Sequence, residues 1–249
     1  MILKSMKRTK ITNKASKGLA GALAIAGGTT AYGDIISVAT PADFNVAPGT
    51  ASVSVNWDVN GDSVVDFIFN YRYNNTATGS GVIWQANMNP FTGSAATNGT
   101  VGYQGAFIRY VTALPGGFSV GATLANSAGG GANNFSTATQ ATLGSRYLSA
   151  GVPSYYSGFA SGPGGTHNAV APGTPAFVGF RFVSGGQTLY GWIQLSVGAG
   201  SIDFISAAYQ STPGTAIAAG AIPEPSSLAM LALGAAGIAG LMVSKRRRA

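Results

Sequence analysis

The stretch AFVGFRFVSGGQTLYGWIQLSV, residues 176–197, predicts a β-hairpin. Its two apolar halves, Ala176–Val183 and Gln187–Val197, flank Ser184-Gly185-Gly186, a sequence typical of a tight turn. One face of the second half carries apolar side chains: Leu189, Ile193, Leu195 and Val197. The side chains that alternate with them are Tyr190, Trp192, Gln194 and Ser196. A repeat of two residues is the period of a β-strand, because successive side chains point to opposite faces.

The same alternation recurs on both sides of this hairpin. In Asp66–Asn74, one face carries Phe67, Phe69, Tyr71 and Tyr73, and the other carries Ile68, Asn70, Arg72 and Asn74. Further strands are expected at Ala51–Asn56, Gly81–Ala86, Ala106–Thr112 and Ser201–Ala208. Seven or eight such strands with Gly-rich turns predict an antiparallel β-sandwich or jelly roll. The Gly-, Ser- and Asn-rich region Gly116–Gly144 is expected to form long surface loops.

The net charge of +7 is concentrated at the two ends of the 249-residue chain. Of the 14 cationic side chains, six precede residue 18 and four lie at Lys245–Arg248. Between residues 34 and 221 the chain has four Arg and six Asp, a net charge of −2. No basic run with interleaved aromatics occurs there, so we expect no nucleic-acid binding. The chain has no Cys, which excludes disulfides and thiolate metal sites.

Residues 1–33 are expected to be a secretory signal peptide. A basic start is followed by the apolar stretch Leu19–Ala26, and Ala31-Tyr32-Gly33 fits the small-x-small rule for cleavage before Asp34. The apolar stretch is too short to span a bilayer as a retained anchor. Residues 34–221 are then the exported body, a β-sandwich ectodomain outside the inner membrane.

The C-terminal stretch IPEPSSLAMLALGAAGIAGLMVSKRRRA, residues 222–249, has three parts in a fixed order. Pro223-Glu224-Pro225 comes first, and Pro225 favours an extended Glu224. The uncharged run Leu228–Val243 follows, and as a helix it would measure about 24 Å, which predicts a transmembrane helix over 227–244. The basic tail Lys245-Arg246-Arg247-Arg248 is expected on the cytoplasmic side. An ordinary tail anchor is the alternative.

The order of these three parts closely resembles the PEP-CTERM sorting signal of Gram-negative bacteria. The resemblance implies an exosortase as partner, an integral membrane protein thought to be a Cys-dependent transpeptidase that reads Pro223, Glu224, Pro225 and the basic end together. The family's usual Val or Leu before the triplet is Ile222 here. Tyr190-Gly191-Trp192 and Pro213-Gly214-Thr215-Ala216-Ile217 also resemble the end of many PEP-CTERM ectodomains.

The segment Asp58–Asp66, DVNGDSVVD, predicts a calcium loop. Oxygen side chains stand at positions 1, 3, 5 and 9, occupied by Asp58, Asn60, Asp62 and Asp66, and position 7, Val64, offers a backbone carbonyl. Ser63 stands at position 6, where calcium loops normally have Gly, so a positive φ there is expected to cost on the order of 1 kcal/mol. The alternative is a turn without metal, in which the Asp side chains bond their own backbone.

We expect no enzymatic activity. His167 is the only His of the chain, and no G-x-S-x-G elbow surrounds Ser161. The body has no Glu, and its carboxylates outside the calcium-like loop are Asp34, Asp43 and Asp203. A paired acid and base of the glycosidase kind would require Asp43 and Asp203 to meet in space.

The sequence therefore predicts an exported, non-enzymatic protein of the cell envelope or extracellular matrix. It would be held in the inner membrane by its tail on the periplasmic side, processed by an exosortase, and delivered to the outer surface or an exopolysaccharide layer. The alternative function is a calcium-assisted, lectin-like carbohydrate-binding module that uses exposed aromatics such as Tyr103, Tyr155 or Tyr156.

Overall fold

The alternating apolar residues of the body form strands throughout the computed structural model. The structure describes residues 34–49, 52–74, 81–91, 98–104, 109–125, 134–137, 141–149, 152–157 and 173–223. The strands within these ranges are β1 (Ile35–Val38), β2 (Phe44–Asn45), β3 (Val53–Trp57), β4 (Phe67–Tyr73), β5 (Gly81–Pro90), β6 (Gly99–Gln104), β7 (Arg109–Val111), β8 (Ser119–Val120), β9 (Asn134–Ser136), β10 (Ala141–Ser149), β11 (Val152–Ser157), β12 (Ala176–Ser184), β13 (Gln187–Val197), β14 (Ser201–Gln210) and β15 (Ile217–Ala218). No helix occurs in this part of the chain, which confirms the all-β prediction.

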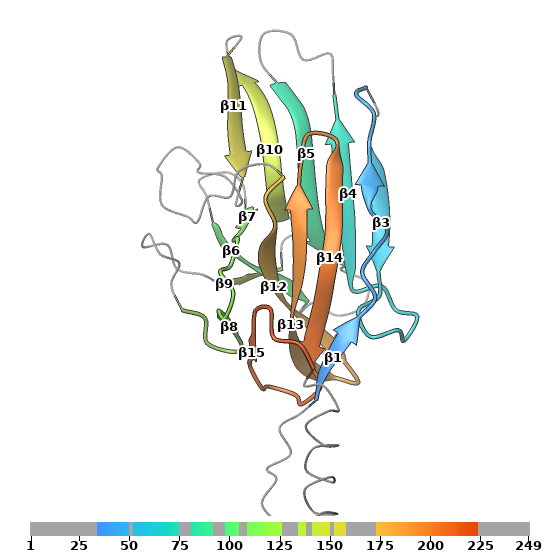
Figure 1. Cartoon of the computed structure of the whole chain (residues 1–249), viewed down its shortest axis with the longest axis vertical. Helices are drawn as coiled ribbons and strands as arrows, with labels where there is room; N and C mark the ends of the chain where they lie inside the picture. The colour runs from blue at the N-terminus through green and yellow to red at the C-terminus, as the bar shows by residue number, and fades with distance from the viewer. Residues whose placement is uncertain are drawn as a thin grey trace, which may run out of the picture. The chain divides into compact units, whose positions relative to one another are not determined.

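Thirteen of these strands form one sheet, in the order β1-β14-β13-β12-β6-β7-β10-β5-β4-β3 (Figure 1). Off this path, β11 pairs with β10, β2 with β14 and β9 with β6. The pairing of β10 with β7 is parallel and the other described pairs are antiparallel, so the sheet is mixed rather than purely antiparallel. A second sheet of two strands joins β15 to β8.

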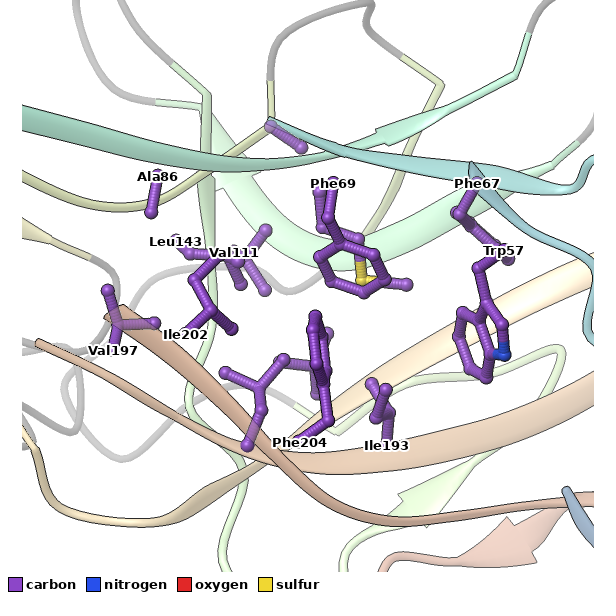
Figure 2. Packing of buried hydrophobic residues seen from close by; sticks show 14 of the residues in the cluster. Trp57, Phe67, Phe69, Ala86, Val111, Leu143, Ile193, Val197, Ile202 and Phe204 are labelled. Carbon is purple, nitrogen blue, oxygen red and sulfur yellow. The ribbon is translucent and has the colours of Figure 1, made fainter. Parts of the chain in front are cut away.

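The large sheet curls so that β3–β5 and β10 face β12–β14 across one apolar core. Figure 2 shows Phe69 of β4 and Phe204 of β14 pointing toward one another from opposite layers, and their ring centroids are 4.7 Å apart. Trp57 of β3 meets Phe180 of β12 at 5.2 Å in the same way. Edge-on aromatic pairs of this kind contribute about 0.5–1.5 kcal/mol beyond the burial of their area. The curled sheet thus gives the two-layered arrangement expected of a sandwich, but without a break between two sheets.

The outer face of β13 is also buried, which its alternation did not indicate, whereas Asp203 and Ile205 of the neighbouring β14 are exposed. Tyr190 and Trp192, on the side opposite Ile193 and Leu195, belong to a second apolar cluster. Its cover includes the segment Thr215–Ala221, called the strap below, which contains β15 and lies beside β8 (Figure 1). Ile217 of the strap is 2% exposed, and burying such a side chain contributes on the order of 2 kcal/mol.

Gly191 separates the two outward-facing aromatics of β13 and makes room on the inner side. It pairs with Phe180 across β12 and β13, and the Phe180 ring lies over it. A Cβ at Gly191 would stand 2.4 Å from Phe180 Cζ and 2.8 Å from the Ala208 carbonyl oxygen. The order Tyr190-Gly191-Trp192 therefore has a packing reason: two aromatics cover the outer face, and the glycine between them admits an aromatic on the inner face.

The expected strands at 51–56, 66–74, 81–86, 176–183, 187–197 and 201–208 are confirmed as β3, β4, β5, β12, β13 and β14, several with longer ends. In the expected strand Ala106–Thr112, the described part contains β7. The interpretation of Gly116–Gly144 as loops alone is wrong for its described residues, which include β8, β9 and the start of β10. β8 and β9 could not be recognised by alternation, because two or three residues show no period.

The chain divides into two units, Met1–Tyr32 and Gly33–Ala249. The first unit, which holds nearly all of the predicted signal peptide, lies outside the described residues. The predicted transmembrane helix at 227–244 lies outside them as well, and among the described residues none forms a helix long and apolar enough to cross a bilayer.

Replacing Gly191 by Ala is expected to destabilise the protein by about 1–3 kcal/mol, because the added methyl group overpacks the site against Phe180. Urea unfolding measures the change. Gly116→Ala is the matched control, since a Cβ there would have Phe177 Cε2 at 3.8 Å as its nearest atom, an ordinary contact. Equal effects of the two substitutions would contradict the packing described for Gly191.

Candidate functional site

The predicted calcium loop connects β3 to β4 at the end of their hairpin. Trp57 and Phe67 are the last residue pair of the ladder, and the Asp66 N–H donates to the Trp57 carbonyl at 2.9 Å. Inside the loop, Asp58 accepts three backbone N–H groups: those of Gly61 at 2.7 Å, Asp62 at 3.2 Å and Ser63 at 2.6 Å. Asp58 thus closes a tight turn around its own carboxylate.

The middle of the loop continues the same pattern of side chain to backbone bonds. Asp62 Oδ1 accepts the Val64 N–H at 2.8 Å, and Asn60 Oδ1 accepts the Asp62 N–H at 3.3 Å. Gly61 has φ +76° and Ser63 has φ +69°, and Ser63 is the non-glycine residue with positive φ in the described part of the chain. The left-handed conformation expected at position 6 is therefore present despite the serine.

Asp66 differs from the other loop carboxylates because it is buried. Its Oδ2 accepts the Val59 N–H at 3.0 Å, and its Oδ1 accepts Asn98 Nδ2 at 3.3 Å. Burial raises the pKa of Asp66 to about 6, and the charges of Asp62 and Asp58 add to this rise, while the two hydrogen bonds oppose it. A charged carboxylate at this position is consequently more costly than on the surface.

Two polar contacts attach the loop to the far end of β12, in the opposite layer. Asn98 is buried, and its Oδ1 accepts the Val183 N–H at 2.9 Å while its Nδ2 bonds Asp66. Asn60 Nδ2 donates to Ser184 Oγ at 2.9 Å and to Asp62 Oδ2 at 3.0 Å. The sequence does not indicate the role of Asn98, because no spacing rule connects it to Asp66, which lies 32 residues away.

The structure brings Asp58, Asn60 and Asp62 together around one turn and directs Asp66 beneath it. Val64, at position 7, is 45% exposed. In the described part of the chain, no three His, Asp or Glu side chains gather closely enough to hold a metal. The loop oxygens serve as acceptors for backbone N–H groups.

The beginning of the predicted sorting signal lies where the chain leaves the body. The Trp192 indole donates to the Ala221 carbonyl at 3.2 Å, and the next residue, Ile222, is 66% exposed. Pro223 is the last described residue. Glu224, Pro225 and the basic residues Lys245, Arg246, Arg247 and Arg248 lie outside the described residues.

The remaining candidates take structural roles or fall outside the described part. Asp43 Oδ1 accepts the Phe204 N–H at 2.7 Å, and Asp203 Oδ2 accepts the Ser196 hydroxyl at 2.9 Å, so each carboxylate supports the β14 region. His167 lies outside the described residues, as do the side chains of Tyr103, Tyr155 and Tyr156.

A comparison with known protein families matches the end of the chain. The family described as PEP-CTERM protein-sorting motif matches residues 221–248. No curated protein and no solved structure matches the chain. The match begins at Ala221, the residue whose carbonyl accepts the Trp192 indole, so the sorting motif starts where the folded body ends.

Replacing Asn98 by Ala is expected to destabilise the protein by about 1–3 kcal/mol, because the Val183 N–H and Asp66 Oδ1 lose their shared partner. Thermal unfolding of the purified variant measures the loss. Asn56→Ala, at an exposed position on β3, serves as the control and is expected to change the free energy of unfolding by less than about 0.5 kcal/mol. Equal losses would mean that Asn98 does not connect the loop to β12.

Proposed function

Because the chain carries the PEP-CTERM protein-sorting motif at residues 221–248, we propose that it is an exported protein of the cell envelope or extracellular matrix, processed at its C-terminus by an exosortase. The observation that carries the proposal is the motif match at the junction between the folded body and the apolar tail. The body then acts as cargo, and its role is structural rather than enzymatic.

The order of the chain supports this proposal. A basic start and an apolar stretch precede the body, as a signal peptide requires, and an uncharged run of 16 residues ending in four cations follows it. We propose that residues 227–244 span the inner membrane until processing, with Lys245–Arg248 on the cytoplasmic side. The body is then held on the periplasmic side before release to the outer surface or to an exopolysaccharide layer.

The chemistry of the Asp58–Asp66 loop supports a calcium ion as a stabilising cofactor. Its residues include carboxylate, amide and carbonyl oxygens, the ligands that calcium prefers, with Asp58, Asn60 and Asp62 around one turn. The charges of Asp58 and Asp62 contribute to the raised pKa of Asp66, and a bound cation would oppose that rise. Asp58, Asn60, Asp62, Asp66 and the Val64 carbonyl are the groups that would hold it.

Glu224→Ala is expected to leave export intact and to block removal of the tail, because the acidic side chain of the triplet would be the element that the exosortase recognises. Mass spectrometry of the C-terminus of the protein from native cells measures the outcome. Replacing the exposed Ile222 by Val, the residue usual in the family, provides the matched control and should be processed like the parent. A Glu224→Ala protein processed at the parent's rate would exclude the triplet as the recognition element.

Calcium is expected to raise the melting temperature of the parent, and Asp62→Asn is expected to remove most of that rise while changing little in EDTA. The amide oxygen retains the acceptor for the Val64 N–H, and the substitution loses only the exposed bond from Asn60 Nδ2, so it removes the charge more than the turn. Asp58→Ala should destabilise in both conditions, since Asp58 accepts three N–H groups. Asp203→Asn, outside the loop, controls for loss of a charge, and a calcium-induced rise that Asp62→Asn retains in full would argue against this metal site.

A further inference from the structure

The strap, Thr215–Ala221, is fastened to the outer face of the body by its own backbone. Ile217 and Ala218 pair with Val120 and Ser119 in the sheet of β15 and β8. The Ala219 N–H donates to the Phe118 carbonyl at 2.8 Å, and the Ala219 carbonyl accepts the Gly117 N–H at 2.8 Å. Over much of the strap, the backbone N–H and C=O groups that an extended peptide could offer to a partner are therefore already bonded to β8 and its neighbours Gly117 and Phe118.

The last turn of the strap is fitted around two aromatic rings. The Trp192 indole donates to the Ala221 carbonyl at 3.2 Å, and the Ala221 N–H donates to the Ala218 carbonyl at 2.9 Å. Gly220 has φ +83°, and a Cβ there would stand 2.9 Å from Phe177 Cζ. Phe177 packs edge-on against Trp192, with ring centroids 5.3 Å apart. The strap is therefore held by a specific turn and by hydrogen bonds, in addition to apolar contacts.

Very little chain separates the docked strap from the sorting triplet. Only Ile222 and Pro223 stand between Ala221 and Glu224, and Ile222 is 66% exposed. The predicted transmembrane helix begins at Ser227, so the five residues Ile222–Ser226 span at most about 17 Å when fully extended. An enzyme acting at this junction has the folded body on one side and the bilayer on the other.

Extended peptides are commonly bound by adding a strand, through backbone N–H and C=O groups. The same groups of the strap cannot pair with β8 and with an enzyme at once. We propose that the docked strap slows removal of the tail. The exosortase engages the junction only after Thr215–Ala221 separates from Trp192 on the outer face of β13. The fraction of chains with an undocked strap therefore sets the rate of tail removal. This inference rests on the proposed function. When only a fraction of the molecules adopts the conformation that a partner binds, the apparent affinity falls in proportion to that fraction.

Trp192 is a positioning residue in this scheme, because it acts through the strap and touches no reacting group. Trp192→Phe keeps an aromatic ring and removes the indole N–H that holds Ala221. The body supplies a matched control in Trp57→Phe. The Trp57 indole donates to the Ala39 carbonyl at 3.0 Å, and the side chain is buried like that of Trp192, but it lies in the inner core.

The test is a pulse-chase of the full chain in native cells, which follows the loss of the tail. Trp192→Phe is expected to lose its tail about fivefold faster than the parent, the factor that loss of one hydrogen bond produces, and Trp57→Phe is expected to match the parent. Hydrogen exchange of the Ala219 amide on the purified full chain should accelerate by a similar factor in Trp192→Phe only. Equal acceleration of tail removal by both substitutions would overturn the proposal, since general destabilisation would then explain it.

A second variant keeps the test decisive if Trp192→Phe fails to fold. A Gly-Ser-Gly-Ser-Gly spacer between Ala221 and Ile222 gives the enzyme free chain without altering the strap, so tail removal should again be faster than in the parent. The same spacer between Gly185 and Gly186, in the exposed turn between β12 and β13, is its control. If the chain with the spacer between Ala221 and Ile222 loses its tail at the parent's rate or more slowly, the proposed role of the strap is wrong. A parent chain that keeps its tail in exosortase-containing cells would instead refute the proposed function.

Discussion

Burial of the β12–β14 layer on its inner face, and of β13 on its outer face as well, is the constraint on which the rest of the structure depends. On the inner side, Phe180 and Phe204 meet Trp57 and Phe69 of the opposite layer. On the outer side, Tyr190 and Trp192 lie under β8 and the strap. The chain has no Cys, so no disulfide fixes the register of these strands. A slip by one residue would exchange two sets of buried side chains of different size, and this difference specifies the register.

The Asp58–Asp66 loop depends on the same strands, although it belongs to the opposite layer. Asn98 and Ser184 hold it at the end of β12, through the Val183 N–H and the Asn60 amide. The loop's own bonds define a turn, and these two contacts define where that turn lies. These contacts couple the loop to the β12–β13 hairpin, because Asn98 bonds both Asp66 of the loop and the Val183 N–H of β12.

The sequence predicted those strands in which apolar residues recur at every second position over five or more residues. β3, β4, β12 and β13 were located because their apolar residues alternate over that length. β8 and β15 were missed, since each has two residues and pairs with a segment far away in the chain. The spacing of the loop predicted its turn and the positive φ of Ser63, which are local properties. Asn98 was not predictable, because its role arises only when the two layers meet.

The position of the strap at the end of the body has a consequence for the order of folding. The outer face of β13 is complete only when Ile217 and Ala219, which are buried, have docked beside Val120. Under the proposed function, these residues would be among the last of the body to leave the cytoplasm, directly before the apolar tail. Phe135 and Phe177, which come earlier in the chain, pack against Tyr190 and Trp192, but the bond between Trp192 and Ala221 forms only when the strap docks, where the sorting motif begins. Completion of the core and presentation of the signal are thus linked by one segment of chain.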